Sequence, residues 1–168
     1  MADLKKALDK VLKWEGGWSD NPKDKGGATM MGITLATYRH FFGVGKTKED
    51  LRNITREELE HIYRKGFWDV MKGDYFANQS LATYVFDWVV NSGVGTLRKI
   101  QECCGLLADG IIGSKSLHVF NTKSKWCFDK IKERRIQFYN KIVENNPSQK
   151  VFLRGWSRRA ESYDYLAD

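Results

Sequence analysis

The sequence of 168 residues contains few of the residues that interrupt or cross-link a chain: 2 prolines, 3 cysteines and 3 histidines. Scarce proline and the lack of low-complexity stretches argue against disorder, and hydrophobic residues, at 42%, can supply a core. Long apolar runs are missing too, because the stretch from Tyr84 to Val90 includes Asp87 and is far shorter than the ~20 residues that span a bilayer. We therefore expect one compact domain, or two small interlocked ones, without a transmembrane segment.

The cysteines and histidines are too few and too scattered to predict a disulfide framework or a metal site. Cys103 and Cys104 are adjacent, which is a poor geometry for a bridge between them, and Cys127 makes the number odd. The three histidines have no ligand spacing with each other or with the cysteines. We expect reduced thiols, no metal and no cofactor.

We expect no secretory signal of the Sec type. The first 14 residues form an amphipathic pattern that has neither a seven-residue apolar segment nor a cleavage site. If the target lies outside the cytoplasm, we expect release of the protein or export by a route other than Sec.

Positive charge is present in excess, and it is gathered in the C-terminal part. The formal net charge is +7, and residues 121–160 hold 11 basic but three acidic residues. Such a surface favours a polyanionic partner: nucleic acid, a membrane surface or a cell-wall polymer. The alternatives are a basic face that is only solvated, or arginines such as Arg134, Arg135, Arg158 and Arg159 that buttress one helix against another.

Hydrophobic residues recur with a period of 3.6, so we expect a mainly α protein. A first helix begins after Asp3 and carries one stripe as far as Glu15, where Gly16 and Gly17 end it. Further helices are predicted from Thr34 to Gly43, after the capping box at Thr55, from Ser80 to Gly93, from Thr96 to Cys104, after Ser114, from about Thr122 to Glu144, and from Phe152 to Leu166. A change to short helices and glycine turns near residue 92 divides the chain into residues 1–92 and 93–168.

Glu15 is the unusual residue of the first helix. It lies on the apolar stripe in the predicted last turn, where burial and the negative end of the helix dipole both disfavour a charged carboxylate. A carboxyl that keeps its proton is what glycosidic cleavage needs as a general acid. The alternative is a glutamate at a helix end that turns to water.

The loop after Glu15 brings further candidates. Asp24 follows in a glycine-rich loop that can fold back, which would place a second carboxylate opposite the first, as in glycoside hydrolysis. Thr29 would orient a water, and Trp18 offers a flat face for a sugar ring. Trp14 also flanks Glu15, but we expect it in the core.

The run EGGWSDNPKDKGGATMMGIT, from Glu15 to Thr34, resembles the signature of glycoside hydrolase family 108, which comprises phage and bacterial N-acetylmuramidases also called secretion activator proteins. The resemblance implies Glu15 as the catalytic acid, Asp24 as the second acidic residue and Thr29 as the loop threonine. The same order of residues is similar to that of phage-type lysozymes, which implies a lysozyme-like fold.

This segment departs from the family pattern in two places. Trp18 replaces the usual tyrosine, and Asp20 precedes Asn21 where the family has the reverse order, so Asp20 shares the role of the usual aspartate. In the second half, residues 86–93 and the turn DGIIGSKSL at residues 109–117 resemble the family's peptidoglycan-binding region. The resemblance adds Asn91 to Trp18 and Asp20 as substrate-binding residues.

The sequence therefore predicts a peptidoglycan hydrolase of the endolysin type that cleaves between N-acetylmuramic acid and N-acetylglucosamine. We expect a monomer that is made in the bacterial cytoplasm, acts at the cell wall or in the periplasm, and does not bind nucleic acid. The alternative is a non-catalytic basic module that binds cell-wall polymer or nucleic acid, in which Glu15 and Asp24 only brace a loop.

Overall fold

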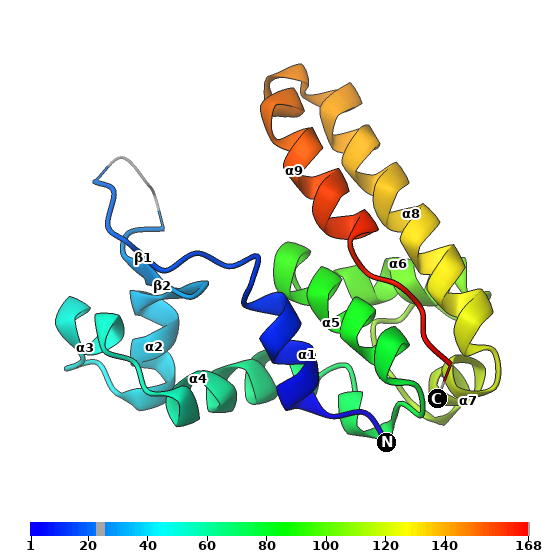
Figure 1. Cartoon of the computed structure of the whole chain (residues 1–168), viewed down its shortest axis with the longest axis horizontal. Coiled ribbons are helices and arrows are strands. Elements are labelled where there is room, and N and C mark those ends of the chain that lie inside the picture. The colour runs from blue at the N-terminus through cyan, green and yellow to red at the C-terminus, as the bar shows by residue number, and fades with distance from the viewer. Residues whose placement is uncertain (23–25, 168) are drawn as a thin grey trace.

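A computed structural model describes residues 1–22 and 26–167 and shows a mainly α, lysozyme-like fold (Figure 1). The helices within these residues are α1 (Leu4–Val11), α2 (Leu35–Phe42), α3 (Lys48–Arg52), α4 (Arg56–Tyr63), α5 (Gln79–Ser92), α6 (Thr96–Cys103), α7 (Ser114–Thr122), α8 (Ser124–Asn145) and α9 (Lys150–Glu161). Shorter helical turns are Arg64–Trp68, Gly73–Tyr75 and Pro147–Gln149. In the described part of the chain, no helix has both the length and the apolarity of a membrane span.

A small antiparallel sheet lies in the glycine-rich segment between α1 and α2. Its strands β1 (Trp18–Ser19), β2 (Thr29–Met30) and β3 (Ile33–Thr34) pair in sequence order. Met31 and Gly32 form the two-residue turn between β2 and β3, and both have positive φ, 50° and 83°. This is the backbone that a tight hairpin turn requires. Strands of two residues are too short to show alternation, so the sequence pattern did not predict the sheet.

Helix α5 is the centre of the core. Every residue from Leu81 to Val89 is buried, including the charged Asp87. Helices α1, α6 and α8 pack against it, and α8 and α9 form an antiparallel pair (Figure 1). A helix that is buried on all sides needs apolar residues on every face, which explains the continuous hydrophobic run.

Most predicted helix ends are confirmed. The side chains of Asp3, Thr34 and Thr55 accept hydrogen bonds from backbone N–H groups in the first turns of α1, α2 and α4. Gly43 and Gly93 end α2 and α5, as their sequence positions predicted. These signals depend on neighbouring residues alone, so they can be read from sequence.

Four boundary predictions were wrong. Helix α1 ends at Val11, well before Gly16, and Asn78 instead of Ser80 caps α5. Ser114 begins α7 without capping it, and α9 ends at Glu161, so the last predicted positions lie in the extended segment that follows. The three cysteines are free thiols.

Candidate active site

Glu15 lies just beyond α1 and is not part of it. The backbone N–H groups of Trp14 and Glu15 both donate to the carbonyl of Val11, at 3.0 and 3.3 Å, in the turn that follows the helix. The Glu15 side chain is 19% exposed, so its carboxyl is largely covered but still reaches solvent. The prediction that Glu15 sits in the last helical turn is therefore wrong, and other elements build its surroundings.

The β2–β3 turn supplies one wall of this site. A Cβ atom added to Gly32 would lie 3.0 Å from Glu15 Oε2 and 2.6 Å from the Tyr63 hydroxyl, so the backbone there passes directly beside the carboxyl. Tyr63, from α4, donates its hydroxyl proton to the Met31 carbonyl at 2.8 Å, which ties the turn to the core. Burial and the negative charge of Glu15 both raise the pKa of Tyr63, so its phenol stays neutral.

Arg159, from α9, supplies the opposite wall. Its Nη2 atom lies 3.1 Å from Glu15 Oε1, and its side chain is 9% exposed. The same guanidinium binds Asp87 through Nε at 3.0 and 3.1 Å and through Nη2 at 2.9 Å. Burial opposes the charge of Arg159, but Asp87 and Glu15 outweigh that cost and hold its pKa above the usual value.

Asp87 is the centre of a buried charge network. Arg135 of α8 donates to its Oδ2 atom at 2.6 Å, and the hydroxyl of Tyr163 donates to its Oδ1 atom at 2.8 Å. Both Asp87 and Arg135 are fully buried. Burial, followed by the charge of Asp87, raises the pKa of Tyr163. Because a buried charge is costly unless it is paired, these groups act as a unit.

The network corrects the expectation of a C-terminal surface that attracts polyanions through all four arginines. Arg135 and Arg159 are buried in ion pairs, so they buttress helices, which was the alternative considered. Arg134 is half-buried and Arg158 is exposed.

Two tryptophans, Trp14 and Trp18, flank Glu15 in the sequence. Trp14 is 39% exposed, so the prediction that it belongs to the core is wrong. Trp18 in β1 is half-buried, with the Arg52 guanidinium 5.7 Å from the centre of its ring. A face already covered by a cation is less open to a sugar ring than the exposed face of Trp14.

Asp20 is the predicted loop carboxylate whose position the structure describes. Asp20 is exposed and forms an ion pair at 3.1 Å with Lys48 of α3. Asp24 lies outside the described residues. Thr29 is half-buried in β2, paired with Ser19 and Thr34, on the same hairpin as the turn beside Glu15.

Asn91 lies at the end of α5 and is engaged by the protein itself. Its Oδ1 atom accepts a hydrogen bond from the hydroxyl of Tyr139, which in turn accepts one from Nε of Arg135 at 2.8 Å. Asn91 therefore borders the Asp87 network, and its role in substrate binding stays a prediction.

Three partners of Glu15 were not anticipated: Gly32, Tyr63 and Arg159. A signal for the last was present, because Arg159 interrupts an apolar stripe in the predicted final helix and Asp87 interrupts the apolar run of α5. A charged residue of each sign on two buried helix faces indicates an internal ion pair. Gly32 and Tyr63 had no such signal, because their proximity to Glu15 depends on how the hairpin lies on α4.

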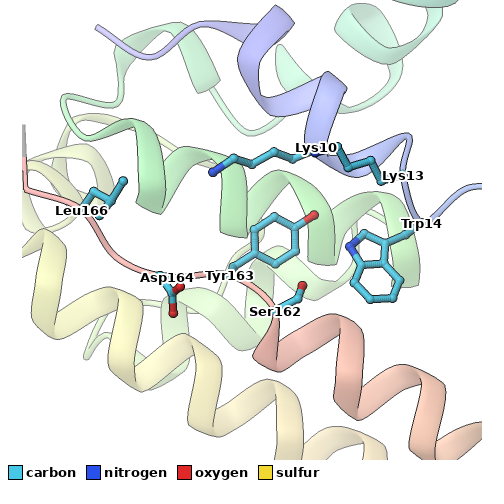
Figure 2. Close-up of a pocket in the computed structure, with 7 residues that line it drawn as sticks. All are labelled: Lys10, Lys13, Trp14, Ser162, Tyr163, Asp164 and Leu166. Atoms are coloured by element: carbon cyan, nitrogen blue, oxygen red, sulfur yellow. The ribbon is translucent and has the colours of Figure 1, made fainter.

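A pocket of about 430 Å³ opens beside Trp14, between the end of α1 and the segment after α9 (Figure 2). Figure 2 shows the Trp14 indole facing the segment that carries Ser162, Tyr163 and Asp164, with the Lys10 side chain extending along the same opening. Trp14, which lines this pocket, directly precedes Glu15 in the sequence. Among the residues with described positions, no cluster of His, Cys, Asp or Glu is suited to a metal ion.

A half-buried carboxyl between a small hairpin and a helical core, in a lysozyme-like fold, defines a candidate glycoside hydrolase. The chain belongs to the glycosyl hydrolase 108 family, whose model matches residues 8–93. A second model, described as a predicted peptidoglycan domain, matches residues 96–161. Together the two matches support a peptidoglycan hydrolase.

A solved structure supports the same fold. The chain is similar to SagA of Brucella abortus, with a TM-score of 0.77 and 29% sequence identity, over 94% of this chain and 89% of that one. No curated protein matches the chain in sequence. The similarity spans both family matches, so the two parts occur together in the related structure.

Proposed function

We propose that the protein is an N-acetylmuramidase that hydrolyses the bond between N-acetylmuramic acid and N-acetylglucosamine in peptidoglycan. The observation that carries the proposal is the Glu15 carboxyl, which is 19% exposed and lies against the hairpin turn within the segment that matches the hydrolase family. This setting keeps bulk water from most of the carboxyl while leaving one side open to a ligand. Glu15 gives its proton to the leaving glycosidic oxygen.

The loop that follows Glu15 completes the proposed chemistry. Asp24 acts as the second carboxylate, and Thr29, whose strand leads into the turn beside Glu15, orients the attacking water. Asp20 is held by Lys48, so it has a smaller part in turnover than Asp24. This assignment rests on the family resemblance of the loop, with Thr29 as its described member.

The pocket beside Trp14 is the proposed place for the polymer to bind. The exposed ring of Trp14 lines the pocket of Figure 2 and offers a flat apolar face to a sugar ring on one side of the reacting bond. Trp18, Asp20 and Asn91 are the other proposed substrate contacts. The enzyme works as a monomer at the cell wall, after synthesis in the cytoplasm, and without nucleic acid.

The proposal is tested with Glu15→Gln on purified peptidoglycan, with products reduced by borohydride and analysed by mass spectrometry. The wild-type enzyme releases fragments that end in reduced N-acetylmuramic acid, and Glu15→Gln lowers the rate at least ~100-fold because an amide cannot donate the proton. Fragments that end in reduced N-acetylglucosamine would identify the other glycosidic bond.

Two further variants complete the experiment. The exposed Glu102, changed to Gln, is a matched control that should keep full activity. Asp24→Asn should reduce turnover more than Asp20→Asn does. If Glu15→Gln keeps more than about a tenth of the activity, Glu15 is not the acid. Wall binding without released fragments would instead favour the non-catalytic module.

A further inference from the structure

We propose that α9 completes the active site, and that Arg159 is a positioning residue that orients Glu15 and couples its charge to the buried Asp87 network. This inference rests on the proposed role of Glu15. Arg159 belongs to residues 96–161, the segment matched by the peptidoglycan domain, whereas Glu15 belongs to the hydrolase segment. The C-terminal part is therefore a structural component of the catalytic centre as well as a polymer-binding region.

The first argument is geometric. Arg159 is held by three hydrogen bonds to Asp87, at 2.9, 3.0 and 3.1 Å, and its side chain is 9% exposed, so its guanidinium has one fixed place. Its Nη2 atom then lies 3.1 Å from Glu15 Oε1. Glu15 itself lies in the turn after α1 and is not part of that helix. Arg159 therefore supplies the orientation that the local backbone does not.

The second argument is the charge of the cluster. The four groups are Glu15 and Asp87, which carry negative charges when ionised, and Arg135 and Arg159, which are positive. The cluster is neutral when Glu15 is ionised and has one excess positive charge when Glu15 is protonated. Since both arginines are largely covered, that excess is poorly compensated by water. The net charge of this buried cluster therefore depends on whether Glu15 carries its proton.

The other groups near Glu15 do not alter this net charge. Tyr63 of α4 gives its proton to the Met31 carbonyl, and Tyr163, after α9, gives its proton to Asp87. Both phenols have raised pKa values and stay neutral near pH 7. Among the described groups, Arg159 is thus the cation in direct contact with the proposed acid.

The experiment compares pH–activity profiles on purified peptidoglycan at constant ionic strength. Arg159→Gln removes a positive charge from the cluster, so the alkaline limb, where the acid loses its proton, should move up by about one pH unit or more. Asp87→Asn removes a negative charge and should move the same limb to lower pH. Arg159→Lys keeps the positive charge and should leave the alkaline limb at the same pH. Its kcat should be lower, because an ammonium group lacks the planar guanidinium that binds Asp87 and Glu15 together.

Shifts in opposite directions for Arg159→Gln and Asp87→Asn would distinguish this role from a merely structural one. A structural role would lower activity in both variants without moving the alkaline limb according to charge. Lys130→Gln, at an exposed position of α8, makes the same change in net charge as Arg159→Gln and should leave the profile in place. Unchanged limbs, or limbs that move in the same direction for Arg159→Gln and Asp87→Asn, would overturn the proposal.

One comparison tests the coupling without relying on those variants to fold. The Glu15→Gln substitution leaves Arg159 without one anionic partner, so the Tm of this variant should be lower than the Tm of Glu102→Gln. An equal Tm would mean that the Glu15–Arg159 contact carries no energy, and the inference would fail. If Glu15→Gln is inactive while the profiles do not move, the inference fails and the proposed function stands. An active Glu15→Gln would reject the proposed function itself.

Discussion

Glycine at position 32 allows the hairpin to approach Glu15. Its φ of +83° is a conformation that L side chains rarely adopt, and a Cβ atom would collide with the Tyr63 hydroxyl and press on the carboxyl. A single residue without a side chain therefore serves both the turn and the site. The cost of any substitution there has a backbone part and a steric part.

The Gly32→Ala substitution should reduce both stability and activity. We expect a loss of stability of about 1–3 kcal/mol from crowding and strain, and at least a ~10-fold loss of activity because Glu15 is displaced. Gly105→Ala is the matched control, since Gly105 has a φ of +73° but an added Cβ atom there would meet nothing within 4 Å. Thermal unfolding and peptidoglycan hydrolysis measure both effects. Full activity in Gly32→Ala would show that the turn does not constrain the acid.

Helix α9 carries basic residues in two different environments, buried and exposed. One face buries Arg159 and Ala160 against the core. Lys150, Arg154 and Arg158 recur every four residues, are exposed, and have no ion-pair partner within the described chain. The sequence pattern showed only an excess of basic residues, and the helix face distinguishes those that stabilise the fold from those available to a polyanion.

Changing Lys150, Arg154 and Arg158 together to glutamine should weaken binding to whole cell walls and reduce its salt dependence. The reason is that exposed charges attract wall carboxylates over a range of ~8 Å at physiological salt. The Tm should stay near the wild-type value, because these side chains are solvated. Sedimentation of walls at several salt concentrations, with thermal unfolding alongside, measures both. Unchanged affinity in the folded variant would mean that this face does not capture the wall.

At the scale of the whole molecule, buried phenols bond segments that are distant in the sequence. Tyr63 of α4, Tyr84 of α5 and Tyr163 after α9 are buried, and burial raises the pKa of each. For Tyr84 the positive charge of Arg135 opposes this effect without cancelling it. The hydroxyl of Tyr84 donates to the carbonyl of Ala160 at 2.8 Å, so the central helix is bonded to α9.

These raised pKa values predict alkaline destabilisation. An unfolded tyrosine ionises near pH 10, whereas the buried phenols stay neutral above that pH, so their contribution to stability is complete below pH 10 and is lost as the pH rises through the folded values. We expect the free energy of unfolding, measured in denaturant, to fall progressively above pH 10. Tyr84→Phe, which cannot ionise, should show a shallower fall. A free energy that is constant from pH 9 to 11 would contradict this prediction.

Much of the fold follows from interactions between near neighbours in the chain. The caps at Asp3, Thr34 and Thr55 and the buried faces of the helices depend on residues within about one turn, so spacing alone predicts them. Glu15 stays a prediction as the acid: its place on the apolar stripe made it a candidate, and the family-like segment singled it out. The two-residue strands and the early end of α1 were not predicted, because they depend on contacts outside their own segments.

The surroundings of Glu15 depend on packing between distant parts of the chain. Arg159 and Asp87 meet because the C-terminal end of α9 packs on α5, and Gly32 reaches the carboxyl because the hairpin is bonded to Tyr63. A buried charge is stable only beside its partner, so the sequence can show that Asp87 and Arg159 need partners. It cannot show which charges meet, because that choice depends on distances of a few ångströms that are set when the helices pack.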